Sequence, residues 1–84
     1  MHDETTSAES VEMDLAEHVV LHLLLDEDHP GPWAEREIAM IVGGELTAAE
    51  AIAGLQSAGL AHRCHEFVFA TRAATRFRDL ARVS

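Results

Sequence analysis

Hydrophobic residues recur every three or four positions from residue 10 to residue 58, and they alternate with polar residues after Leu60. The first spacing predicts amphipathic helices and the second predicts strands. A first helix is expected over residues 10–25. The acidic segment 26–32 contains two prolines, which cannot continue a helix, and should end it. The core stripe of this helix is predicted to be Met13, Ala16, Val19, Val20 and Leu23.

Two shorter helices should follow. One is predicted over residues 35–42, with Ile38, Ile41 and Val42 facing inward and two glycines, 43 and 44, giving a left-handed exit. Thr47 and Glu50 have the spacing of a capping box, which predicts the next helix over residues 48–58. The buried side of that helix is expected to be Ala48, Ala51, Ile52 and Leu55.

The last quarter of the chain predicts a hairpin and a helix. Strands are expected over residues 60–64 and 67–71 around a tight turn at residues 65–66. Thr71 can then cap a helix over residues 72–83 that packs through Ala73, Phe77 and Leu80. The fold class is therefore mainly α with a small β-hairpin, in the order helix, helix, helix, hairpin, helix.

A chain of 84 residues has room for one hydrophobic core. Residues 1–9 are acidic and rich in Ser and Thr, and are expected to be a disordered arm. Residues 10–84 should form a single domain. Its core is predicted to contain Val20, Leu23, Ile38, Ile52, Leu55 and Phe77.

Three segments resemble a winged helix-turn-helix. Residues 34–43 (AEREIAMIVG) resemble the first helix of that motif, and residues 55–63 (LQSAGLAHR) look like the segment that leaves the recognition helix for the wing. Residues 69–74 (FATRAA) resemble the exit from the wing in MarR- and PadR-like transcriptional regulators. The resemblance implies a small regulator that binds duplex DNA as a dimer.

Six residues are the candidate DNA contacts: Thr47, Gln56, Ser57, Arg63, Arg72 and Arg76. The outward side of the expected recognition helix, centred on Glu50, Ala53 and Ser57, carries no basic residue, although such helices normally bring Arg, Lys, Asn or Gln to the base edges. The alternative is therefore a winged-helix module for protein contact or dimerisation that does not bind DNA. The arginines of the last helix have an alternative role as members of ion pairs, since Arg76 and Arg82 each lie three residues from Asp79.

A dimer is expected through the first helix. Leu21 and Leu25 lie opposite its core stripe, beside His18 and His22, and a helix that is apolar on two sides is usually buried twice. A second subunit would bury this side most simply. The resemblance to MarR-like regulators, which dimerise through their terminal helices, implies the same. The alternative is packing under the N-terminal arm or under the final helix.

Net charge is −9 and unevenly spread, since residues 1–28 hold nine acids and no base whereas residues 60–84 hold five arginines and two acids. The single cysteine, Cys64, allows no internal disulfide and favours the cytoplasm. No apolar run reaches the length of about 18 residues that a spanning helix needs. Lys, Asn and Tyr are absent and Ala is abundant, which indicates a GC-rich prokaryotic genome.

Catalysis and metal binding find little support. The sequence has no glycine-rich phosphate loop and no nucleophile elbow, so we expect a binding module without cofactors and not an enzyme. His18, His22, His62, Cys64 and His65 suit zinc or copper by chemistry. Paired-cysteine spacing is missing, however, and surface histidines are the simpler interpretation.

Overall fold

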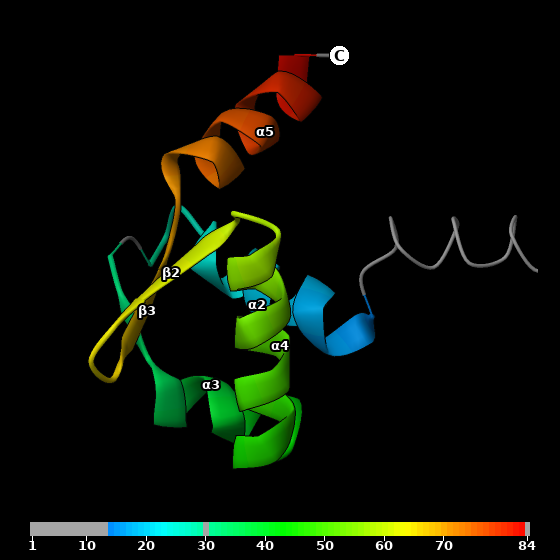
Figure 1. Cartoon of the computed structure of the whole chain (residues 1–84). Coiled ribbons are helices and arrows are strands. Elements are labelled where there is room, and N and C mark those ends of the chain that lie inside the picture. Colours follow the sequence, from blue (N-terminus) through cyan, green and yellow to red (C-terminus); the bar gives the residue numbers. More distant parts are fainter. Residues whose placement is uncertain (1–13, 30, 84) are drawn as a thin grey trace, which may run out of the picture.

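The computed structural model describes residues 14–29 and 31–83. The expectations for residues 1–13, which include the arm and Met13, lie outside the described residues. The described part is mainly helical with a small antiparallel sheet, the arrangement expected of a winged helix-turn-helix (Figure 1). Its elements are α2 (Leu15–Leu24), β1 (Trp33–Ala34), α3 (Glu35–Val42), α4 (Glu45–Ser57), β2 (Ala61–Cys64), β3 (Phe67–Ala70) and α5 (Arg72–Val83).

A capping box begins α2. The backbone N–H of Glu17 donates to the Asp14 carboxylate at 2.9 Å, and the N–H of Asp14 donates to the Glu17 carboxylate at 3.1 Å. Each carboxylate thus satisfies a backbone donor that a helix start leaves free. The helix therefore begins at Leu15, five residues later than the start predicted at residue 10.

The turn between α3 and α4 is shorter than predicted. The bounds of α3 are confirmed, and Gly43 and Gly44 leave it with φ of 99° and 147°, which only glycine adopts easily. Gly44 is then the N-cap of α4, and its carbonyl accepts a hydrogen bond from Ala48. The capping box predicted for Thr47 and Glu50 is wrong, because the glycine turn lets the helix begin three residues earlier.

The predicted hairpin is confirmed, and a third strand joins it in a small sheet. β2 and β3 pair around a turn at His65 and Glu66, where His65 has φ of 58°. β1 pairs with the other edge of β3, with Trp33 opposite Val68, so the strand order is β1-β3-β2. Two residues are too few to show alternation, so hydrophobic periodicity does not reveal β1.

The core lies between α2, α3, α4 and the sheet. Its largest fully buried side chains are Val20, Ile38, Ile52, Leu55 and Val68. Four of these were predicted, and Leu23 packs against them from the edge.

Four residues that the sequence predicts to face the core are exposed. Phe77 is 67% exposed because α5 meets the body through the buried Ala74, on another side of the helix. Ala73 and Leu80, predicted to pack with it, are exposed for the same reason. Figure 1 shows α5 extending away from the other elements. Ile41 is also largely exposed, and Ala39 takes the inward position on α3 instead.

Gly54 brings α2 and α4 close together. A Cβ at this position of α4 would overlap the carboxylate of Glu17, the same group that caps α2. The glycine therefore leaves room for the Glu17 carboxylate between the helices and does not serve an unusual backbone conformation.

Core truncation should destabilise the domain strongly. Ile52→Ala or Leu55→Ala leaves a cavity at a fully buried site and should lower the free energy of unfolding by ~2–5 kcal/mol. Leu15→Ala, at a position that is mostly exposed, is the control and should change it by less than ~0.5 kcal/mol. Urea unfolding followed by circular dichroism measures both, and equal effects would contradict the core assignment.

Gly54→Ala should act through Glu17. Alanine stabilises a helix interior by about 1 kcal/mol relative to glycine, but here it displaces a capping carboxylate worth a similar amount. We expect almost no net change in the native background and a gain of about 1 kcal/mol when Glu17→Ala is already present. A double-mutant cycle measures this coupling, and equal gains in both backgrounds would show that the two residues do not meet.

Candidate interaction surface

A groove lies between the start of α3, the start of α4 and the turn of the hairpin. Three of its side chains are carboxylates, Glu35, Glu45 and Glu66, and one is a cation, Arg36. We call it the acidic groove, and its lining residues are Ala34, Glu35, Arg36, Ala39, Glu45, Ala49 and Glu66. Glu35 comes from the start of α3, Glu45 follows the glycine turn at the start of α4, and Glu66 comes from the hairpin turn.

Arg63, the arginine of the hairpin, is paired with one of the groove carboxylates. Nη2 of Arg63, on β2, lies 3.5 Å from Oε2 of Glu35, and both side chains are about one third exposed. Residues 45–57, the whole of α4, contain no Lys, Arg or His. The surface formed by α4 and the hairpin turn is therefore negative on balance, and an approaching phosphate would meet carboxylates.

An exposed apolar patch borders the acidic groove where α3 ends and α4 begins. It consists of Met40, Ile41 and Leu46, of which Met40 is 85% and Leu46 73% exposed. Glu37, Glu45 and Glu50, on the same two helices, are exposed near it in the chain. We call Met40, Ile41 and Leu46 the α3–α4 corner. Exposed apolar groups that are rimmed by charge are typical of interaction surfaces.

The six residues predicted to contact DNA do not form one cluster. Gln56 and Ser57 are exposed at the end of α4. The start of α5 lies beside the loop after α4, because the Thr71 hydroxyl donates to the Gly59 carbonyl at 2.7 Å. Arg72 and Arg76, both exposed, therefore lie at this end of α4. The remaining two lie elsewhere: Thr47 is half-buried in the first turn of α4, and Arg63 faces Glu35.

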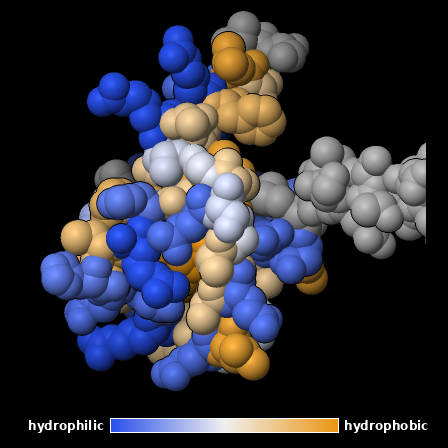
Figure 2. Space-filling view, viewed as in Figure 1, coloured by the Kyte–Doolittle hydropathy of each residue, from blue (hydrophilic) through white to orange (hydrophobic). Residues whose placement is uncertain are grey.

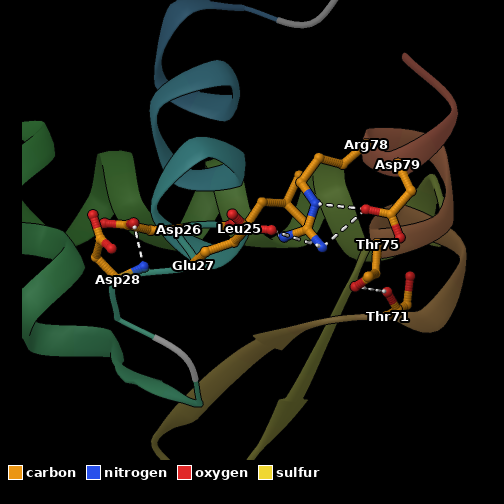
Figure 3. A network of polar contacts seen from close by, with 8 residues as sticks. All are labelled: Leu25, Asp26, Glu27, Asp28, Thr71, Thr75, Arg78 and Asp79. Carbon is orange, nitrogen blue, oxygen red and sulfur yellow. Dashed lines mark hydrogen bonds and ion pairs between the residues drawn. The ribbon is translucent and has the colours of Figure 1, made fainter. Parts of the chain in front are cut away.

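Arg78 fastens α5 to the end of α2. Its guanidinium donates to the Leu25 carbonyl at 2.9 Å and to the Asp79 carboxylate at 3.1 and 3.2 Å, and it lies 3.8 Å from a Glu27 oxygen (Figure 3). Asp79 therefore pairs with Arg78, and the pairing considered for Arg76 is not formed. No local pattern reveals this contact, because Leu25 is 53 residues away from Arg78.

Thr71 gives α5 its second attachment. Its hydroxyl accepts from the Ala74 N–H at 3.2 Å, which confirms the predicted cap, while donating to Gly59. Figure 3 also shows the Thr75 hydroxyl donating to the Thr71 carbonyl, at 3.3 Å. The helix is thus fixed at its start and near its middle.

The residues expected at a dimer interface lie on α2 and in the turn after it. His18 and His22 are exposed. Leu21, however, is half-buried and packs against the core, and Leu25 is half-buried too. The premise that Leu21 faces away from the core is wrong, so α2 leaves less apolar surface for a partner than its sequence indicated.

The other candidate chemistry stays dispersed. Within residues 14–29 and 31–83, no three His, Cys, Asp or Glu side chains are placed to hold a metal ion. Cys64 is exposed, and the rings of His62 and His29 contact Phe69 and Trp33. No single described helix is long and apolar enough to cross a membrane; α3 and α4 pass that test only as a pair, bent by 112°.

Comparison with known proteins finds no family, no curated protein and no solved structure that matches this chain.

Removing the Arg78 contacts should free α5. Arg78→Ala deletes a charge-assisted hydrogen bond to the end of α2, worth about 1–2 kcal/mol, so amide exchange in the second half of α5 should become about five to thirty times faster. Arg76→Ala, on the same helix without a described ion pair, is the matched control. Hydrogen–deuterium exchange measures both, and similar rates in the two variants would remove Arg78 from this role.

Proposed function

We propose that this chain is a winged-helix module that acts by contacting proteins, through the acidic groove and the α3–α4 corner. The observation that carries the proposal is the charge of the surface around α4. The helix that would enter a DNA groove has no cation, and Glu35, Glu45 and Glu66 surround its first turns.

DNA binding depends mainly on neutralising phosphates with Lys and Arg. Residues 14–71 contain ten acids against two arginines, and one of these, Arg63, is paired with Glu35. A protein segment that carries arginine or lysine beside apolar side chains suits the same surface. Its cations would meet the glutamates and its apolar groups would cover Met40 and Leu46. Opposite charge and shared apolarity together favour a protein partner.

A second candidate function is the dimeric transcriptional regulator that the resemblance to MarR- and PadR-like proteins implies. One observation favours it: Arg72 and Arg76 are exposed and form no ion pair within the described residues. They lie at the end of α4 that carries Gln56 and Ser57, the two side chains of α4 that suit base edges. DNA would then approach the end of α4 and not its first turns. A cytoplasmic location, expected from the single cysteine, stays a prediction.

Titration with mixed-sequence duplex DNA separates the two candidates. The protein-contact proposal expects no binding at low salt, because most of the surface repels phosphate. The regulator instead requires binding that weakens steeply as salt rises and that is lost in Arg72→Ala/Arg76→Ala. Fluorescence anisotropy of labelled DNA measures both.

Arg36→Ala/Arg63→Ala is the matched control, because it removes the same charge from in and beside the acidic groove. DNA binding could be lost in this variant and yet persist in Arg72→Ala/Arg76→Ala. That pair of results would place the duplex on the acidic groove. That result would contradict the protein-contact proposal directly.

A further inference from the structure

The acidic groove continues along α3 as far as the glycine turn. Its volume is about 430 Å³, and a second pocket of about 380 Å³ adjoins it. The two share Arg36, Ala39 and Glu45 in their walls. The second pocket reaches Met40 and the glycine turn, whereas the first reaches Glu66 in the hairpin turn. One continuous depression therefore leads from the hairpin to the α3–α4 corner.

The two ends of this depression differ in chemistry. In the first pocket, Glu45 and Glu66 form no ion pair within the described residues, and Glu35 meets Arg63 alone. Met40, in the second pocket, is 85% exposed. Figure 2 shows hydrophilic surface over the hairpin turn and the start of α3, and hydrophobic surface where α3 and α4 meet. The complementary ligand carries a cation at one end and an apolar group at the other.

The geometry of α3 sets the spacing of these two groups. Arg36, Met40 and Gly43 follow one another at intervals of four and three residues, so they lie on one side of the helix. Seven residues of helix rise about 10 Å, a length that about three residues of extended chain cover. Alternate side chains of an extended chain point to the same side. A cation and an apolar side chain two positions apart would therefore both enter the depression.

We propose that this depression binds an extended segment of another protein, in which an arginine or lysine and a large apolar residue are two positions apart. The cation enters the first pocket among Glu35, Glu45 and Glu66, where hydrogen bonds between charged groups stabilise it. The apolar side chain covers Met40 in the second pocket. The inference rests on the proposed protein-contact function and names the class of segment that its surface recognises.

Peptide titration of the full-length chain tests this assignment. The probe is the capped peptide GSRSLRSLSG, which carries the pattern twice, and amide chemical shifts of the isotope-labelled protein report its binding. Shifts should concentrate at residues 34–49 and at Glu66, with a dissociation constant below about 1 mM. Capped GSESLESLSG, which replaces the cations by acids, and capped GSRSSRSSSG, which lacks leucine, should each bind at least about fivefold more weakly.

Three variants assign the parts of the depression. Glu45→Gln/Glu66→Gln removes two carboxylates from the first pocket and should weaken binding of GSRSLRSLSG more than about tenfold. Met40→Ser should abolish the preference for leucine while circular dichroism stays unchanged, because this side chain is mostly exposed. Arg36→Gln should strengthen binding, since it removes a positive charge that repels the cation of the peptide.

Asp28→Asn/Glu50→Gln is the matched control, because it removes two exposed acids that line neither pocket and should leave the affinity unchanged. Absence of shifts with GSRSLRSLSG, equal binding of the basic and acidic peptides, or a control as weak as Glu45→Gln/Glu66→Gln would each overturn the assignment. A parent that binds duplex DNA and no peptide would overturn the protein-contact function as well. A parent that binds neither would overturn only the class of segment.

Discussion

Burial of Val20 between α3 and α4 is the constraint on which the rest of this structure depends. Val20, Ile38 and Ile52 come from three different helices and are each fully buried. Leu55 and Val68 extend the same cluster to the end of α4 and to the sheet. A domain of this size has few other apolar contacts with which to offset its conformational entropy. The glycine turn after α3 and the close approach at Gly54 both serve this one junction.

The small core explains why α5 is attached by polar groups. Ala74 is its one described side chain that is buried against the body. Position is fixed instead by Thr71, which caps α5 and bonds to Gly59, and by Arg78, which reaches the Leu25 carbonyl. Such contacts are directional but give little apolar burial. Phe77 is therefore exposed on α5, as it would not be on a helix held by core contacts.

The parts of the fold that could be predicted are those set by neighbours in the sequence. The bounds of α3, the hairpin turn at His65 and the Thr71 cap depend on residues within four positions, and all were predicted. The start of α4 was not, because Gly44 and Thr47 offer competing caps and only the chain path after α3 decides between them.

Long-range features of the site could not be predicted. Periodicity identifies an apolar face on α5 but not whether the body covers it, so Phe77 was placed in the core. The partner of Arg78 is a backbone carbonyl far along the chain, which has no signature in side-chain pattern. The acidic character of α4 was visible in the sequence, but the joining of Glu35, Glu45 and Glu66 in one groove required the fold.

The charge distribution of this chain does not follow from its fold, and function depends on such surface chemistry and not on the fold alone. A positive surface at α4 and the hairpin would attract a polyanion. Here four of the six arginines belong to α5, at the opposite end of the molecule from the α3–α4 corner. The molecule is therefore electrically polar along its length. The carboxylates around the acidic groove therefore oppose a polyanion at α4, and the same field favours a surface that carries arginine or lysine.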